Sequence, residues 1–272
     1  MSERMTQQEL KLANKKHRRI GLIVLGIFIV GIVYSLFYSK EDLLTRKQTL
    51  DLLKMKNDIE KQQEQNSFEK DDIGEVQSKF RPLLNLNENF VGWVTIEGTG
   101  MDYPVLAGND YKRFLTMSFF GEYNENGSLA VDEHSSIGTG VKGNYVRTPG
   151  MNLIIHGNNR SSGLMFGRLL DFQTKEFADE HSKIIFETLY EKREYQVISV
   201  FFDDMDEHRL NPFQFDKYCY AKSQEEFQYF YDNIQKKALY DTEIKANYND
   251  EFLTLTTPVK NGKFAVIAVR LK

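Results

Sequence analysis

Short apolar runs separated by Gly, Asn and Asp residues dominate the chain after residue 80. Runs of this kind that are rich in β-branched and aromatic residues predict β-strands. The last two are the clearest, because 252–257 alternates in polarity, Asn261-Gly262 supplies a turn, and 264–271 returns to apolar residues. We predict eight strands, at residues 90–100, 101–108, 127–133, 152–157, 183–189, 194–202, 252–257 and 264–271.

Helical patterns interrupt these strands. Residues 223–239 begin with Ser223 and Glu226 in capping-box spacing, and apolar residues then follow at helical intervals. Shorter helices are predicted at 164–172 and 109–117. Mostly antiparallel strands with inserted helices predict a mainly β fold, closed or nearly closed into a barrel.

The amino-terminal part has a different pattern. Residues 20–39 contain no charged residue, and residues 1–19 carry a net charge of +4. Because roughly 20 apolar residues span a hydrocarbon core, 20–39 is predicted to be one transmembrane helix. The positive flank places 1–19 in the cytoplasm and the rest of the chain outside the cell membrane. A cleavable signal peptide is the alternative, but the run is long and no small-residue cleavage site follows it.

The segment between this helix and the strands is polar. Residues 40–79 are rich in Lys, Glu, Gln and Asp, with leucines at loosely helical spacing. Residues 60–72 have almost no apolar side chain with which to form a core. We therefore interpret 40–79 as a juxtamembrane helix and solvated stalk, and place the folded domain at 80–272.

Composition narrows the function classes. The net charge is −4, so a basic face for nucleic acid is not expected, and 41% hydrophobic residues suffice for a packed core. Cys219 is the single cysteine, which excludes an internal disulfide; it is interpreted as partly buried and inert. We find no cofactor motif, and no partner at metal-ligand spacing for His134, His181 or His208.

Several motifs together resemble a class B sortase. They are "NENFVGWVTIEGTGMDYPVLAGND", "FFGEYNENGSLAVDE", "NLIIHGNNRSSGLMFGRLLDF", "KIIFETLYEKREYQV" and "FLTLTT", spread over residues 80–272. Class B sortases are membrane-anchored cysteine transpeptidases of Gram-positive bacteria. The resemblance implies an eight-stranded sortase barrel after one transmembrane helix. It also implies a His, Cys and Arg site in which a thiolate attacks the carbonyl after the Thr of a sorting signal.

Two of these catalytic positions are changed in this chain. The family reads T-L-x-T-C at the end of the seventh strand, where this chain has Thr256, Thr257 and then Pro258. Proline has neither a thiol nor a backbone N–H, so the nucleophile position is vacant. Lys263 stands at the family's Arg position and keeps the charge without the planar fork.

The histidine position leaves two alternatives. The family shows Gly-His-Asn after the fourth strand, whereas this chain reads His156-Gly157-Asn158. Strict alignment puts Gly157 in the catalytic position; a shifted loop would let His156, the candidate acid or base, enter the cleft. The resemblance also places Leu115, Thr256 and Thr257 in the substrate groove, although Thr257 as a replacement nucleophile would need an assured base.

Two functions remain open. The loss of the nucleophile, the Arg fork and the Gly-His order favours a catalytically silent sortase homologue that keeps a peptide-binding groove. The alternative is an active transpeptidase that anchors proteins to the cell wall through sorting-signal cleavage. In either case the expected partners are the membrane and a peptide or protein with a sorting-signal-like segment, with a peptidoglycan precursor as a further candidate.

Overall fold

The computed structural model describes the backbone of residues 7–66, 75–137, 152–204 and 213–271. His208 lies outside these residues. By its contacts the chain divides into two compact units, Met1–Leu44 and Thr45–Lys272. The helix α1 (Gln7–Asn66) begins in the first unit and continues into the second.

The predicted transmembrane segment 20–39 lies within α1. Among the residues that the structure describes, no helix is sufficiently long and apolar to cross a membrane. Residues 34 and 36–39 of the predicted segment have side chains outside the described part of the chain.

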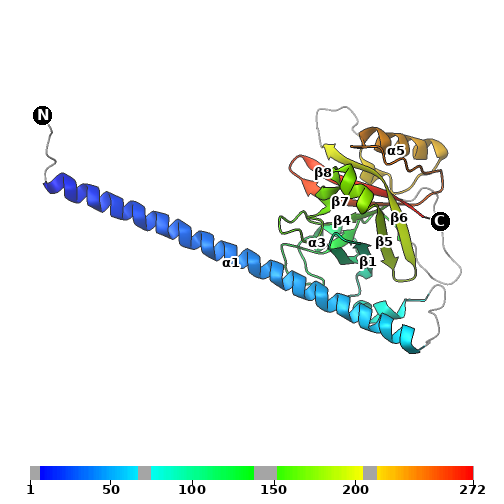
Figure 1. The fold of residues 1–272 in the computed structure, drawn as a ribbon, viewed down its shortest axis with the longest axis horizontal. Helices are drawn as coiled ribbons and strands as arrows, with labels where there is room; N and C mark the ends of the chain where they lie inside the picture. Colours follow the sequence, from blue (N-terminus) through cyan, green and yellow to red (C-terminus); the bar gives the residue numbers. More distant parts are fainter. Residues whose placement is uncertain (1–6, 67–74, 138–151, 205–212, 272) are drawn as a thin grey trace. The chain divides into compact units, whose positions relative to one another are not determined.

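The second unit is built around a closed barrel of eight strands, as the sequence predicts (Figure 1). Their order around the barrel is β1-β2-β3-β4-β7-β8-β6-β5, and β1 pairs with β5 to close it. Two neighbouring pairs, β2–β3 and β4–β7, are parallel, and the others are antiparallel. The strands are Phe90–Ile96 (β1), Met101–Leu106 (β2), Leu129–Val131 (β3), Asn152–His156 (β4), Lys183–Thr188 (β5), Lys192–Asp204 (β6), Phe252–Val259 (β7) and Gly262–Arg270 (β8).

The clearest inserted helix is α5 (Gln224–Lys237), which lies against β6 on the outside of the barrel (Figure 1). The Ser223 side chain caps it by accepting a hydrogen bond from the Glu226 N–H, as the capping-box spacing predicts. Its inner face buries apolar side chains against the sheet. The remaining short helices are η1 (Ser78–Phe80), α2 (Arg81–Leu86), α3 (Tyr111–Phe114), η2 (Leu169–Gln173), α4 (Lys175–Glu180) and η3 (Phe215–Lys217).

The predicted helix at 164–172 is shorter than expected. Only Leu169–Gln173 is helical, as the 3₁₀ turn η2. Gly163 and Met165 have positive φ, and such backbone conformations interrupt a helix. The predicted helix at 109–117 is likewise reduced to the single turn α3, capped by the Asp110 side chain.

The compact unit begins at Thr45, whereas the sequence pattern placed its start near Phe80. The difference arises because α1 beyond Thr45 packs against the barrel. Leu52 is only 2% exposed, and Thr45 and Lys56 are buried polar residues. These positions lie on one face of the helix, but two of them are polar, so a search for apolar periodicity does not detect the face.

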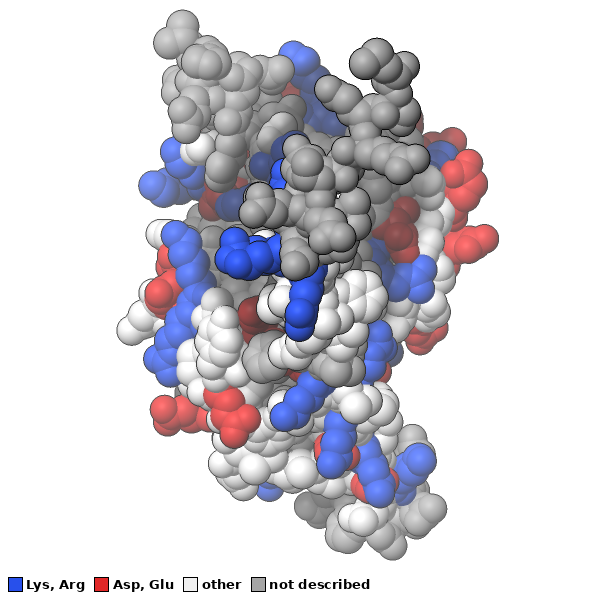
Figure 2. Space-filling model, turned by 90° about the vertical axis from the view of Figure 1, so that its left-hand side faces the viewer, with Lys and Arg blue, Asp and Glu red and all other residues white. Residues whose placement is uncertain are grey.

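Charges of both signs cover the surface. Figure 2 shows Lys and Arg side chains mixed with Asp and Glu side chains on one face of the molecule. This mixture agrees with the small net charge of −4.

Candidate functional site

A polar cleft of about 850 Å³ lies beside the start of β8. Its walls come from α3, the residues that follow β3, the segment 214–222, and β8 itself. These segments are distant in sequence, and they meet here because β3, β4, β7 and β8 are neighbours in the barrel. Both lysines and carboxylates line the cleft, together with Tyr111 and Tyr220.

Pro258 and Lys263 face each other across the β7–β8 hairpin, since they are register partners. Pro258 is exposed, and Lys263 lines the cleft. The Lys263 Nζ lies 2.8 Å from a carboxylate oxygen of Asp216 and 5.8 Å from the centre of the Phe215 ring. Burial disfavours the charged form of Lys263, but the bond to Asp216 outweighs it and raises the pKa of this lysine.

His156 ends β4 and is 5% exposed. Its Nε2 lies 2.9 Å from a carboxylate oxygen of Asp132, and its ring stacks on Tyr111 with centroids 3.8 Å apart. Both of these partners line the cleft. His156 is therefore a buried residue behind the cleft wall, held by one carboxylate and one aromatic ring.

Gly157, the other histidine-position alternative, has no space for a side chain. A Cβ built at this position would collide with Leu129 and Phe166. The pairing of β4 with β7 shows which residue lies level with Pro258. His156 pairs with Thr256 in the parallel β4–β7 ladder, and the Thr257 Oγ1 donates to the Gly157 carbonyl over 2.7 Å.

Continuing this register by two residues brings Asn158 level with Pro258. The Asn158 Nδ2 donates to the Leu115 carbonyl over 2.6 Å and lies 3.3 Å from two further carbonyl oxygens, those of Glu125 and Asn126. Its amide is thus committed to the backbone of a neighbouring loop. Asn158 is not among the site residues expected from the sequence, although counting two residues past the end of each parallel strand identifies it.

Two of the residues expected in a substrate groove are buried and hydrogen-bonded. Thr256 and Thr257 are each 1% exposed, and the Thr256 Oγ1 donates to the Phe264 carbonyl over 3.0 Å. A buried hydroxyl that is already hydrogen-bonded is a poor nucleophile. The cleft described above is lined by neither threonine, nor by Leu115.

Two curated proteins are similar to this chain over most of its length. Sortase B of Staphylococcus aureus is 26% identical over 183 residues, which cover 67% of this chain and 68% of that protein. Sortase B of Listeria monocytogenes is 24% identical over 248 residues, covering 91% and 92%. The chain is thus similar in sequence to two sortases B. No protein-family model matches it.

Solved sortase B structures share the fold. Sortase B from Bacillus anthracis in complex with AAEK2 is 26% identical with a TM-score of 0.67, covering 84% of this chain and 95% of that chain. The Staphylococcus aureus sortase B–substrate complex is 22% identical with a TM-score of 0.69, covering 85% and 98%. The barrel is therefore of the sortase type.

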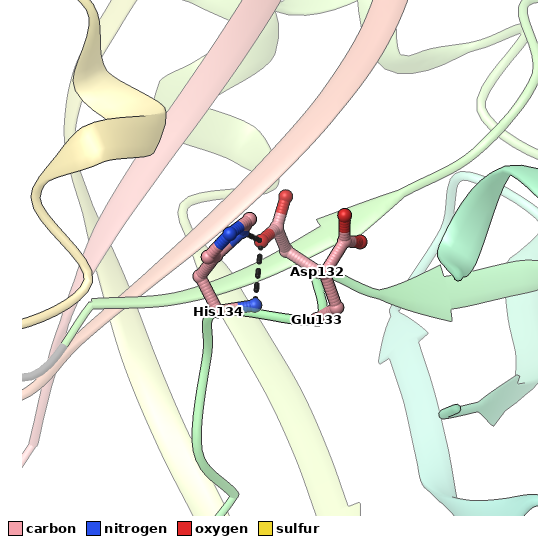
Figure 3. A group of neighbouring side chains, drawn as sticks. All are labelled: Asp132, Glu133 and His134. Carbon is pink, nitrogen blue, oxygen red and sulfur yellow. Dashed lines mark hydrogen bonds and ion pairs between the residues drawn. The ribbon is translucent and has the colours of Figure 1, made fainter. Parts of the chain in front are cut away.

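In this sortase B-like chain, three polar residues follow β3. Figure 3 shows the ring and the backbone nitrogen of His134 turned to the same carboxylate oxygen of Asp132, at 3.0 and 2.9 Å. Asp132, Glu133 and His134 offer ligand atoms within 4.8 Å of one another. From the sequence, His134 is expected to have no partner at metal-ligand spacing, whereas the structure places these two carboxylates beside it. Asp132 is already engaged by two histidines, and the other two residues are exposed.

Cys219 borders the same cleft but is 3% exposed. Its Sγ lies 3.6 Å from the Ser135 Oγ and 3.5 Å from the Asp216 carbonyl. Burial, together with nearby carboxylates, raises the pKa of this thiol to about 11. The cysteine is consequently protonated at neutral pH, and the reactive thiolate is scarce.

Asp132 gives this site a pH dependence. Burial alone would raise its pKa, but hydrogen bonds from His156 and His134 lower it to about 2 from the ordinary 3.8. A depressed carboxyl pKa stabilises the folded state above the ordinary value, and this contribution is lost as the pH falls towards about 2. As the pH falls from 3.8 to about 2, the melting temperature of the wild-type chain should therefore fall more than that of Asp132→Asn.

Glu133→Gln is the matched control, because it removes the adjacent, exposed carboxylate. It should follow the wild type through the acid range. Equal acid losses in the wild type and in Asp132→Asn would show that Asp132 does not couple to folding.

Proposed function

We propose that this sortase B-like protein is a membrane-anchored surface protein that binds an extended peptide without cutting it. The observation that carries the proposal is Pro258, which stands at the end of β7 opposite Lys263 with no thiol in register. A transpeptidase of this family needs a thiolate there, and proline offers neither a nucleophile nor an oxyanion donor.

The other groups support the same conclusion. Cys219, the single cysteine, is buried with a pKa raised to about 11. The Nε2 of His156 is engaged by Asp132, and the amide of Asn158 donates to the Leu115 carbonyl. Among the residues that the structure describes, the level of Pro258 therefore offers no thiol, and Asn158 at that level is no base.

The cleft has the composition of a peptide site. Its lysines, carboxylates and tyrosines offer ionic and hydrogen-bonding partners to a backbone and to polar side chains. Solved sortase B structures include a substrate complex from Staphylococcus aureus and a complex with triglycine. We transfer from them the class of ligand, an extended peptide, and retain a sorting-signal-like segment as the expected sequence.

The anchor is part of the proposal. The uncharged run 20–39 with its positive amino-terminal flank would hold the compact unit on the outer face of the cell membrane. Protease added to intact protoplasts should then digest the chain beyond residue 40. Protection of that part would contradict this topology.

Peptide binding can be tested by fluorescence anisotropy on the full chain with a labelled substrate peptide of Staphylococcus aureus sortase B. Lys263→Glu should weaken binding about tenfold or more, because it reverses a partly buried charge in the cleft wall. Lys260→Glu makes the same change at an exposed residue of the same hairpin and should have little effect. Equal effects of the two substitutions, or no binding by the wild type, would defeat the proposal.

Restoring the thiol alone should not restore reactivity. Pro258→Cys is expected to react slowly with a peptide that carries an electrophile, because Asn158 at the same level is no base. Adding Asn158→His and Lys263→Arg should increase the yield of covalent adduct, measured by mass spectrometry with circular dichroism as the folding control. A single variant that reacts as fast as the triple variant would show that the local environment already activates a thiol.

A further inference from the structure

The loop that follows α3 exposes two aromatic side chains. Phe120 is 43% exposed and Tyr123 is 73% exposed, whereas Phe119 between α3 and the barrel is 5% exposed. The Ser118 N–H donates to the Glu122 carbonyl over 2.7 Å, and Met117 bridges to Tyr123. The two aromatic rings are therefore presented by a hydrogen-bonded loop.

This loop is fastened to α1 where the helix enters the compact unit. The Nδ2 atoms of Asn124 and Asn126 each lie 3.0 Å from the Thr45 Oγ1, which accepts both hydrogen bonds. Thr45 is 4% exposed and is the first residue of the unit. These two hydrogen bonds hold the aromatic loop next to Thr45.

Chain length then limits how far the loop can lie from the apolar run. Only residues 40–44 separate Thr45 from residue 39, the end of that run. Even a fully extended link over these residues reaches about 20 Å. The headgroup layer on each side of the hydrocarbon core is about 5–8 Å deep. When 20–39 spans the bilayer, Thr45 and the loop bonded to it are therefore tethered within about 20 Å of the hydrocarbon core, and the outer headgroups are within reach of the loop.

The residues around the loop suit such a surface. Tyrosine is favoured at the membrane–water interface, and phenylalanine can bury its ring at the boundary between headgroups and acyl chains. Lys112, Arg113 and Arg46 are exposed nearby, and the Arg113 Nε lies 3.5 Å from the Met117 sulfur at the base of the loop. Basic side chains attract anionic headgroups, and Glu122 and Glu125 within the loop oppose them.

We propose that the loop 117–126 docks in the headgroup layer of the membrane that anchors the chain, with Phe120 and Tyr123 as interfacial side chains. The inference rests on the proposed anchor at 20–39. Tyr111 and Lys112, which line the cleft, precede the loop by a few residues. Docking would therefore set the height and orientation of the cleft above the bilayer.

Quenching by lipids with brominated acyl chains tests the proposal on the full chain in vesicles of phosphatidylcholine and phosphatidylglycerol. Trp93, the native tryptophan, is fully buried and provides a constant background. Phe120→Trp reports on the loop, and Phe28→Trp reports on the apolar run. Tyr229→Trp is the matched control, because Tyr229 is 49% exposed on α5.

The expected result is that Phe28→Trp and Phe120→Trp both lose emission in brominated vesicles, while Tyr229→Trp behaves like the wild type. Quenching of Phe28→Trp without quenching of Phe120→Trp would overturn the docking and leave the anchor intact. Absence of quenching in both Phe28→Trp and Phe120→Trp would refute the anchor itself. Equal quenching of Phe120→Trp and Tyr229→Trp would mean that the domain lies on the membrane without a preferred face, which also overturns the proposal.

Discussion

Glu187→Gln is expected to lower the free energy of unfolding by about 3–5 kcal/mol. The Glu187 carboxylate, on β5, lies 2.6 Å from the Lys79 Nζ and 3.4 Å from the Lys56 Nζ. Burial favours its neutral form, yet these two lysines hold its pKa below the ordinary range. Removing the carboxylate would leave two buried ammonium groups. Within the described part of the chain, only Lys79 then retains another acidic partner, Glu60 at 3.0 Å.

The loss should include detachment of α1 from the barrel, because Lys56 lies on that helix and sits 5.0 Å from the centre of the Trp93 ring. Trp93 fluorescence during urea unfolding of the detergent-solubilised chain would measure the loss of unfolding free energy and report the detachment of α1. Glu194→Gln is the matched control, since Glu194 also contacts two lysines but its side chain is 37% exposed, against 12% for Glu187. It should leave the urea midpoint almost unchanged, because solvent screens its ion pairs. Similar losses for Glu187→Gln and Glu194→Gln would mean that the burial of the ion pairs around Glu187 adds nothing to the free energy of unfolding.

Replacing Phe264 with Ala should lower the free energy of unfolding by about 3–5 kcal/mol, and Trp93→Ala should have an effect of the same size. Both side chains are fully buried in the barrel unit, Phe264 inside the barrel and Trp93 beneath α1. Truncation would leave a cavity that close-packed neighbours cannot fill. Urea unfolding followed by circular dichroism applies to both variants, including the one that lacks the tryptophan.

Phe120→Ala is the control for these truncations, because it removes a ring of the same type from an exposed loop. Its effect in detergent should stay within about 1 kcal/mol. Losses below that value at both Phe264 and Trp93 would contradict the observed strand register.

The eight strands could be predicted from sequence because alternation and turn residues are local signals. The parallel pairings β2–β3 and β4–β7 could not, since they depend on which strands meet after long connections. The docking of α1 was also missed. Its contacts at Thr45 and Lys56 are polar, and their partners Asn124 and Glu187 lie far along the sequence.

The candidate site also has features that local sequence predicts and features that depend on distant strands. The facing pair Pro258 and Lys263 could be derived from one hairpin, because residues on both sides of a short turn can be counted. The surroundings of His156 could not, since its partner Asp132 comes from another strand end and Asn158 becomes relevant only through the β4–β7 register. The cleft wall at Asp216 also depends on a segment outside the barrel strands.

The most direct test of binding without cleavage is mass spectrometry of the full chain incubated at neutral pH with a substrate peptide of Staphylococcus aureus sortase B, with that enzyme as the positive control. The account predicts that the peptide is recovered intact and that the mass of the chain does not change, under conditions in which anisotropy shows the peptide bound. Cleaved peptide together with an acyl adduct on Cys219 or any other residue would contradict it.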